Sequence, residues 1–423
     1  MNILLGVLIG IFCLMFLVTA HEFGHFIMAR RSGVRVVEFG ICFPPRAVAW
    51  TKGKDGKWHK IPRDDWQKPQ EGLIFSLNLL PIGGFCQMDG ESDADTKKAT
   101  FGAATFWQKT KILFGGVFMN WLIAFLIFTL LAWIGMPIFL DNQFSIDSDK
   151  SLDYSYIEVT NVAENSPADR AGFKPGDKIL KINGEEVYTA YDEAFSKYPG
   201  EEVSYEIQRD LCKTSAPTKE GEIAPVMSDC APDYEHWRDF TLTATLNEVD
   251  NEWGYLLGVS MSSSQVYARY SWSAPIVGFG TTLQLTGETF KGVGELLWNL
   301  VSGAAKQLSF NKETRESGQA AISSASEGVT GPIGIIGVLF PSFAKTGFSN
   351  IAFLFALISV SLACMNVLPI PALDGGRWLM IFLSRLRHKR LTKETEEKIV
   401  ARAMIVLLIL MAIITILDIT RLF

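Results

Sequence analysis

The chain has 423 residues, of which 48% are hydrophobic and 20% are charged, and its formal net charge is −6. Its mean hydropathy of +0.19 is too high for an ordinary soluble protein of this size. The charged fraction is in turn too high for a chain made only of membrane spans. We therefore expect several spans and at least one water-exposed domain. Nothing in the chain resembles a nucleic-acid-binding surface, so we expect no nucleic-acid partner.

Four segments are long and apolar enough to cross a bilayer as helices: 3–27, 111–138, 349–369 and 399–420. With their flanks, the four membrane regions are 1–30, 109–140, 346–376 and 398–423. The first segment lacks a basic start and a small-residue cleavage site. We therefore interpret it as a retained span and not as a cleaved signal peptide.

Basic residues are concentrated in two of the connecting loops, 31–108 and 377–397. The positive-inside rule places both loops in the cytoplasm. Both termini then lie outside the cytoplasm, together with the acid-rich segment between the second and third spans.

An apolar stretch at about 73–90 lies inside the first of these loops. It is short for a span, and Pro81 with Gly83 and Gly84 would break a helix. Alternating residues around such a turn favour a β-hairpin. We expect the hairpin to re-enter the membrane, where extended backbone survives if it is buried in protein or lines a wet cavity. A hairpin lying on the cytoplasmic face is the alternative.

The outer segment contains a predicted compact domain at 150–262. Its strands alternate around the turns Ser166-Pro167-Ala168 and Pro175-Gly176-Asp177, a pattern typical of a PDZ domain. PDZ domains bind extended peptides at a sheet edge. An insertion at 211–236 carries Cys212 and Cys230, which we predict to form a disulfide in an oxidising compartment.

Residues 263–345 follow, and apolar side chains such as Phe290, Leu297 and Val301 recur in them at helical spacing. This spacing predicts amphipathic helices at the outer membrane–water interface. The polar stretch 312–326 is expected to be a linker.

The end of the first span reads HEFGH at 21–25. Ionisable residues inside a span are costly, so their presence indicates function. On a helix, His21 and His25 share one face, as zinc ligands must, and Glu22 lies where it can activate a water. The alternative is a helix that carries two unrelated histidines.

A catalytic zinc needs a third protein ligand. The other three histidines lie in polar loops, so we expect a carboxylate from another span. Asp374 meets this expectation, because it follows the third span after Pro369 and Pro371 and precedes two glycines that also break the helix. A helix-capping role for Asp374 is the alternative. Both motifs lie at the cytoplasmic ends of their spans, so they can meet.

HEFGH in the first span and NVLPIPALDGG at 366–376 together resemble the site-2 protease family of intramembrane zinc metalloproteases. The chain is more narrowly similar to the bacterial regulator-of-sigma-factor proteases, and the resemblance covers nearly all of it. It implies a polytopic α-helical membrane protein, with four transmembrane helices and a re-entrant β-hairpin, plus an extracytoplasmic α+β PDZ-like domain. It further implies a bacterial inner-membrane location and an active site towards the cytoplasm.

The resemblance also implies roles for particular residues. His21, His25 and Asp374 would bind one zinc ion, Glu22 would be the general base, and Asn366 would hold the substrate backbone. Gly116 and Asn120 of the second span match a family Gly-x-x-x-Asn element near the site. We expect the hairpin to hold an unwound substrate as an added strand, through Gly83, Gly84 and Phe85.

The expected substrate is a single-span membrane protein, such as an anti-sigma factor or a remnant signal peptide. The PDZ-like domain would exclude untrimmed substrates or bind a trimmed substrate end. Some relatives carry tandem PDZ domains, but only one is evident here, which puts a two-domain filter in doubt. The alternatives are an inactive membrane scaffold that presents a PDZ module and, more weakly, a cation transporter.

Overall fold

The computed structural model describes the chain except for residues 1–2, 54–55, 67–71, 91, 93–94, 96, 141, 154–156, 188–196, 212–236, 248–255, 264–266, 308–310, 328–330, 389–391 and 423. The chain forms two units. The first comprises Met1–Ile134, Gln143–Asp147 and Ser271–Phe423, and the second comprises Gly135–Asn142 and Ser148–Tyr270. The predicted disulfide between Cys212 and Cys230 lies outside the described residues.

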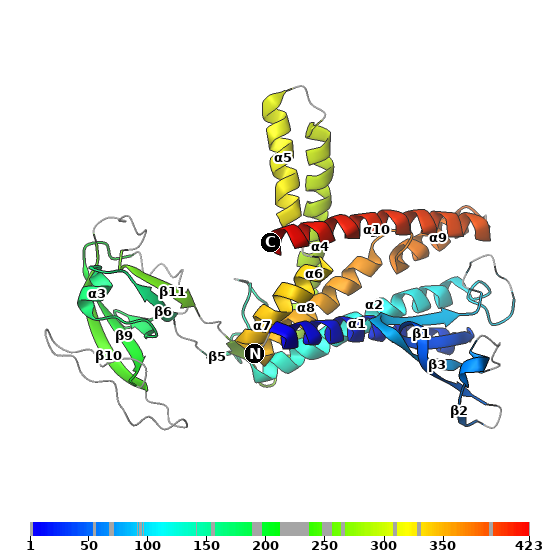
Figure 1. Cartoon of the computed structure of the whole chain (residues 1–423), viewed down its shortest axis with the longest axis horizontal. Coiled ribbons are helices and arrows are strands. Elements are labelled where there is room, and N and C mark those ends of the chain that lie inside the picture. Colours follow the sequence, from blue (N-terminus) through cyan, green and yellow to red (C-terminus); the bar gives the residue numbers. More distant parts are fainter. Residues whose placement is uncertain are drawn as a thin grey trace. The chain divides into compact units, whose positions relative to one another are not determined.

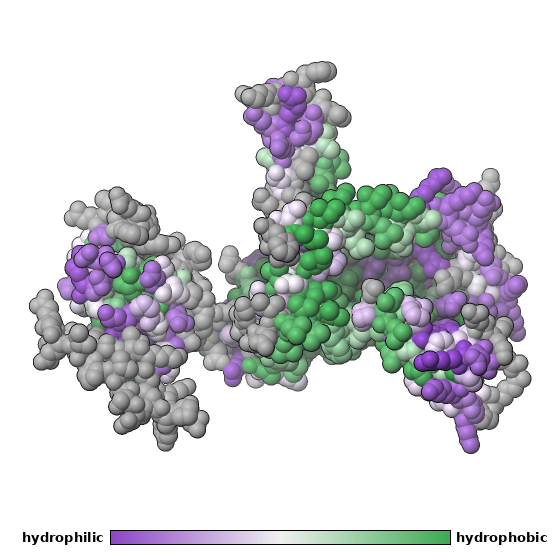
Figure 2. All heavy atoms as spheres, in the orientation of Figure 1, coloured by the Kyte–Doolittle hydropathy of each residue, from purple (hydrophilic) through white to green (hydrophobic). Residues whose placement is uncertain are grey.

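The first unit contains four helices long and apolar enough to span a membrane: α1 (Ile3–Arg31), α2 (Phe106–Ile134), α8 (Phe348–Val367) and α10 (Lys393–Leu422). Their apolar windows have mean hydropathies of 2.0 to 2.8. Hydrophobic residues cover these helices, whereas hydrophilic residues gather around the sheet β1–β3 and the nearby ends of α9 and α10 (Figure 2). The four helices fit a polytopic membrane protein. Helix α10 begins six residues before the predicted span because its polar first turns continue the helix, supported by a Lys398–Glu394 ion pair.

Close helix contacts hold the span bundle together. A Cβ added to Gly24 of α1 would collide with the backbone of Gly115 in α2, so these helices touch where neither has a side chain. Helix α8 packs on α2, and Ser359 Oγ donates a hydrogen bond to the backbone carbonyl of Asn120 over 2.7 Å. Small and polar residues are typical of such contacts inside membranes.

A three-stranded sheet follows α1, with strand order β2-β1-β3. Its strands are β1 (Val36–Lys52), β2 (Trp58–Lys60) and β3 (Ile74–Met88). Residues 38–41 of β1 face residues 74–77 of β3 and also residues 84–87 of β3. The two ends of β3 therefore lie on either side of β1. The predicted hairpin was wrong in its pairing, because a segment of β1 separates the two arms that the sequence pattern would pair directly.

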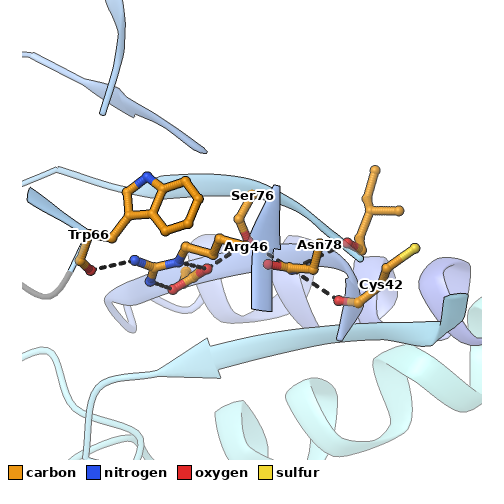
Figure 3. Close-up of polar contacts among 7 residues, drawn as sticks. Cys42, Arg46, Trp66, Ser76 and Asn78 are labelled. Carbon is orange, nitrogen blue, oxygen red and sulfur yellow. Dashed lines mark hydrogen bonds and ion pairs between the residues drawn. The ribbon is translucent and has the colours of Figure 1, made fainter. Parts of the chain in front are cut away.

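A buried polar network holds the irregular middle of β1 (Figure 3). Arg46 donates from Nε to Glu38 Oε1 over 3.1 Å and also pairs with the other carboxylate oxygen. Ser76 Oγ donates to the same Glu38 Oε1 over 2.6 Å. Asn78 Nδ2 donates to the carbonyl of Cys42 over 3.0 Å. Because Glu38 is only 3% exposed, Arg46 and Ser76 supply the hydrogen bonds that its buried carboxylate needs.

The second unit is built around a twisted sheet with strand order β10-β9-β7-β6-β11, and β8 (Glu185–Glu186) pairs with β7. Its strands are β6 (Ile157–Val162), β7 (Lys178–Ile182), β9 (Glu202–Asp210), β10 (Trp237–Thr245) and β11 (Val259–Ser263). A second small sheet, in the order β4-β12-β5, contains β4 (Met136–Pro137), β5 (Ser151–Asp153) and β12 (Tyr267–Arg269).

A short helix, α3 (Pro167–Ala171), joins β6 to β7. Ser166 caps its start by accepting a hydrogen bond from the Asp169 N–H, and Gly172 ends it with φ 88°. The Ser166-Pro167-Ala168 turn that the sequence pattern singled out is therefore the capped start of a helix. Apolar side chains from β6, β7 and β9 form the core of this unit.

Helices α4 (Ala274–Gln307) and α5 (Lys312–Glu327) pack along each other as a pair that projects from the span bundle (Figure 1). The predicted polar linker at 312–326 was wrong, because this stretch forms α5. Its three Glu and three Ala residues favour a helix although the stretch lacks an apolar face. Helix α4 exposes Leu297 (53%) and Trp298 (71%).

The chain returns to α8 through α6 (Pro332–Gly334), η3 (Ile335–Leu339, one π-helical turn) and α7 (Phe340–Thr346). Asp418 of α10 accepts hydrogen bonds from the N–H of Gly331 over 3.1 Å and of Gly334 over 2.8 Å. Asp418 is only 4% exposed. Helix α9 (Asp374–Leu386) then follows α8 after a short turn.

Candidate active site

Two histidines of α1 face each other one helical turn apart. The Nε2 atoms of His21 and His25 are 3.1 Å apart, and each residue is 7% exposed. The i, i+4 spacing of the sequence places both rings on the same helix face. The two nitrogens therefore point at one small volume.

The rest of the helix bundle fixes the orientation of these rings. His25 Nδ1 lies 2.8 Å from the carbonyl oxygen of Ile112 in α2, so Nδ1 carries the proton and Nε2 keeps its lone pair. A Cβ added to Gly116 of α2 would stand 2.6 Å from His25 Nε2 and 2.7 Å from His21 Cε1. Only glycine leaves room for the two rings at this position.

Asp374 joins the histidines from the other end of the chain. Its Oδ2 lies 3.1 Å from His21 Nε2 and 3.3 Å from His25 Nε2. Asp374 directly follows the turn between α8 and α9. This turn is tight, since a Cβ on Gly375 or Gly376 would collide with backbone carbonyls at the end of α8 or in the turn. Glycine at both positions thus lets the carboxylate reach α1.

The three ligand atoms have the spacing of a metal site. In a tetrahedral zinc site with bonds of about 2.0–2.1 Å, ligand atoms stand about 3.4 Å apart. The separations between His21 Nε2, His25 Nε2 and Asp374 Oδ2 are 3.1, 3.1 and 3.3 Å. Oδ2 of Asp374 is buried and receives no hydrogen bond from the described residues. Two imidazole nitrogens and one carboxylate oxygen fit zinc and leave its fourth position open.

Glu22 lies beside this cluster. One of its carboxylate oxygens is within 4.8 Å of the ligand atoms of both histidines. Its Oε2 accepts a hydrogen bond from the backbone N–H of Cys86 in β3 over 3.1 Å. The carboxylate is thus held close to the two histidine nitrogens.

A cavity of about 470 Å³ opens onto these residues. It is lined by His21, Glu22, His25, Phe85, Cys86, Gln87, Met88, Leu113, Asn366, Ala372, Leu373, Asp374 and Arg377. Asn366 is in the cavity wall, and its Nδ2 donates to the Leu362 carbonyl of its own helix over 3.0 Å. One edge of the sheet, the turn before α9 and the two histidines of α1 therefore line the same cavity.

The three predicted substrate-binding residues of the hairpin have different surroundings in the structure. Phe85 lines the cavity, but Gly83 and Gly84 do not. They let β3 approach α1, because a Cβ on Gly83 would stand 2.6 Å from Val18 and one on Gly84 3.2 Å from Thr19 Oγ1. Their role here is close packing of β3 against the helix.

Asn120 lies one helical turn beyond Gly116 on α2 and is 1% exposed. It does not line the cavity, and its side-chain oxygen and nitrogen have no hydrogen-bond partner among the described residues. The structure gives no physical account of why an amide is placed there.

Sequence reasoning did not single out seven of the residues that line the cavity, and Arg377 and Cys86 are the two with the clearest contacts. Arg377 follows Asp374 by three residues, and its guanidinium lies 5.0 Å from the ring of Phe101. Its place after the glycines could have revealed it. Cys86 contributes its backbone N–H, and no residue pattern shows which N–H groups of a strand face a site.

Comparison with known proteins agrees with this geometry. The family model described as peptidase family M50 matches residues 9–61 and 65–411. A protein of Clostridium perfringens is 27% identical over 406 residues, covering 95% of each chain, and one of Agrobacterium fabrum is 25% identical over 437 residues, covering 97% of this chain and 95% of its own. A third, from Campylobacter jejuni, is 25% identical over 418 residues, and the alignment covers 96% of this chain and 91% of the relative. All three bear the name "putative zinc metalloprotease".

The family match covers most of the chain and includes both motifs that meet in the cavity. A zinc-dependent hydrolase is also what two histidines, an aspartate and an adjacent glutamate fit chemically. The chain belongs to peptidase family M50, the site-2 protease family, and is a zinc metalloprotease.

Proposed function

We propose that this protein is an intramembrane endopeptidase that hydrolyses peptide bonds within or near the transmembrane segments of single-span proteins. The observation that carries the proposal is the meeting of His21, His25 and Asp374 within 3.3 Å of one another, on and beside helices of membrane-spanning length. His21, His25 and Asp374 are the proposed zinc ligands. Bound zinc supplies a Lewis acid that polarises a carbonyl and acidifies water.

Glu22 is the proposed general base. It takes a proton from the attacking water and passes it to the leaving amine. The Cys86 N–H keeps the Glu22 carboxylate pointed into the cavity. Asn366 in the cavity wall is placed to donate to the substrate backbone or to the developing oxyanion.

The substrate helix must be unwound before attack, because its carbonyls are hydrogen-bonded within the helix. Residues 84–87 of β3 pair with β1 on one side, and the Cys86 N–H faces the catalytic cavity. An unwound substrate added along this strand would be held extended beside Glu22. Phe85 would contact its side chains.

The bilayer arrangement is also part of the proposal. Basic residues after α1 and after α8 favour a cytoplasm-facing site and both termini outside. The bacterial origin of the relatives named above favours a bacterial inner membrane. The exposed apolar side chains of α4, including Leu297 and Trp298, suit the outer membrane–water interface.

The second unit is proposed to be the PDZ-like domain. Its short capped helix between two strands and its five-strand sheet path support that interpretation. It would exclude untrimmed substrates or bind a trimmed substrate end. Deletion of 154–259 tests the exclusion: cleavage of an untrimmed substrate should increase, and unchanged selectivity would refute a size filter.

The Glu22→Gln variant tests the chemistry. It should keep one zinc per chain and lose peptide cleavage, which also separates a protease from a scaffold or a cation transporter. Glu288→Gln, an exposed change on α4, is the matched control and should keep both zinc and cleavage. Cleavage retained by Glu22→Gln would refute the assigned base. Comparing membrane peptides that accumulate in cells carrying either variant would identify the substrate.

A further inference from the structure

The two histidines of the proposed zinc site differ in how their second ring nitrogen is held. His25 Nδ1 lies 2.8 Å from the Ile112 carbonyl oxygen of α2. His21 Nδ1 is buried and has no hydrogen-bond partner among the described residues. When Nε2 of His21 serves as a zinc ligand, Nδ1 must carry the proton of the neutral ring. A histidine that binds zinc almost always donates this proton to an acceptor, which orients the ring. His21 therefore needs an acceptor.

The side chain of Asn120 in α2 is a second buried polar group without a protein partner. Asn120 is 1% exposed, and its side-chain oxygen and nitrogen make no hydrogen bond to any described residue. Its backbone is held in place, because its carbonyl accepts a hydrogen bond from the Ser359 hydroxyl over 2.7 Å. A buried amide is costly when its hydrogen bonds are not made. Asn120 therefore needs a polar partner close by.

Contacts at two levels show that α1 and α2 run antiparallel. Gln108 at the start of α2 donates to the Ser32 carbonyl just after α1 over 3.1 Å. Ile123, about four turns further along α2, packs in the same apolar cluster as Leu17 of α1. One turn forward along α2 therefore corresponds to one turn back along α1.

This arrangement puts Asn120 at the level of His21. A Cβ on Gly116 would stand 2.7 Å from His21 Cε1, so the His21 ring lies against α2 at Gly116. Asn120 follows one turn later on the same face of α2. Side chains on a helix lean towards its N-terminus, so the Asn120 amide leans towards Gly116 and the His21 ring. His25 is held from the opposite direction, because Ile112 lies one turn before Gly116.

We propose that Asn120 is a positioning residue for the zinc ligand His21. Its side-chain oxygen accepts, through one ordered water, the proton on His21 Nδ1, as the Ile112 carbonyl accepts that of His25 directly. The water is needed because the two side chains make no direct hydrogen bond, and a buried water with such polar partners is stable. This inference rests on the proposed zinc ligands. Asn120 would fix the tautomer and the ring angle of His21, with the lone pair of Nε2 towards the metal.

The zinc affinity of the full-length protein tests the proposal. Purified variants in micelles compete for zinc with a coloured chelator of known affinity. Asn120→Leu has a similar size but no polar side-chain atom, and it should bind zinc about 10- to 100-fold more weakly. Asn120→Asp keeps an acceptor oxygen in the same place and should bind zinc at least as tightly as the unsubstituted protein. Thr281→Val is the matched control on α4. It removes a buried hydroxyl that also bonds no described residue, and it should leave the zinc affinity unchanged.

Two further measurements separate positioning from folding. The zinc-free Asn120→Leu protein should unfold at the same temperature as the unsubstituted protein or higher, because the Asn120 amide bonds none of the described residues. The visible absorption bands of the cobalt-loaded protein should shift in Asn120→Leu and not in Thr281→Val, because the His21 ring turns. Unchanged zinc affinity in Asn120→Leu would overturn the proposal. Zinc binding by Asn120→Asp as weak as that by Asn120→Leu would also overturn it.

His21→Ala separates this inference from the proposed function. It removes the ligand itself and should abolish zinc binding at the site. Zinc binding retained by His21→Ala would refute the assignment of His21 as a ligand. Zinc lost by His21→Ala but bound with full affinity by Asn120→Leu would keep the proposed ligands and overturn only the role of Asn120.

Discussion

The backbone N–H of Cys86 donates a hydrogen bond to Glu22 Oε2 over 3.1 Å and so joins the edge of β3 to the helix that carries the histidines. Only the main chain of Cys86 takes part in this contact. The position of the proposed base therefore depends on where β3 lies.

This contact predicts a difference between two substitutions at Cys86. Cys86→Pro removes the N–H and should lower cleavage by about tenfold or more, because Glu22 loses the donor that orients it. Cys86→Ala keeps the N–H and should retain most activity. Both should retain zinc, measured as metal per chain. Equal loss of cleavage in the two variants would show that the side chain, and not the N–H, matters.

Gly116 gives a second prediction. In Gly116→Ala, the new methyl would stand 2.6 Å from His25 Nε2, so the ring must shift away from the metal position. Zinc per chain and cleavage should both fall sharply. Gly287→Ala on α4 meets no atom within 4 Å and is the matched control. Full zinc occupancy in Gly116→Ala would contradict the close packing described above.

Tyr205 in the core of the second unit predicts a stabilising substitution. Its hydroxyl has no hydrogen-bond partner among the described residues, and its ring packs 5.3 Å from that of Phe173. Tyr205→Phe removes a buried unpaired hydroxyl and should stabilise the unit by about 1 kcal/mol. Hydrogen exchange of the β9 amides should slow about fivefold in consequence. Faster exchange would reveal a partner for the hydroxyl.

The same residue sets a pH dependence. Burial raises the pKa of Tyr205 above its usual value of about 10. Folding therefore favours the neutral phenol, and its contribution to stability is complete below about pH 10 and is lost as the pH rises through the raised pKa. Tyr205→Phe should abolish that alkaline loss, which amide exchange measured across pH would detect.

The buried ion pair of the second unit should be costly to break. Arg209 Nε donates to Asp177 Oδ1 over 2.6 Å, and the side chains are 1% and 0% exposed. Asp177→Ala removes the carboxylate beside the buried Arg209 guanidinium and should destabilise the unit by about 3–5 kcal/mol. Lys181→Ala, which breaks an exposed pair with Glu206, should cost less than about 1 kcal/mol. Thermal unfolding of the two variants in parallel would decide, and similar losses would contradict the role of burial.

Local patterns in the sequence foretold much of the molecule. The i, i+4 spacing of His21 and His25 is a property of one helix, and the structure brings their ligand atoms together. Asp374 was found because a zinc site needs a third ligand and the chain offers few carboxylates near spans. The four long helices follow from apolar length alone.

What the sequence could not foretell depends on contacts between distant segments. The insertion of β1 between the two ends of β3 is a long-range pairing, and alternation in β3 alone is equally consistent with a simple hairpin. The approach of Cys86 to Glu22 follows from that pairing. Helix α5 was missed for another reason, since a polar helix beside a longer one lacks the apolar periodicity by which helices are recognised.

Asp418 has one further consequence for the last helix. The two backbone N–H groups supply hydrogen bonds to a carboxylate that is almost completely buried. The two bonds also fix the angular setting of α10. A slip of one residue would turn the helix by about 100° and break both bonds. The N–H groups of Gly331 and Gly334 thus hold the last helix in a single rotational register.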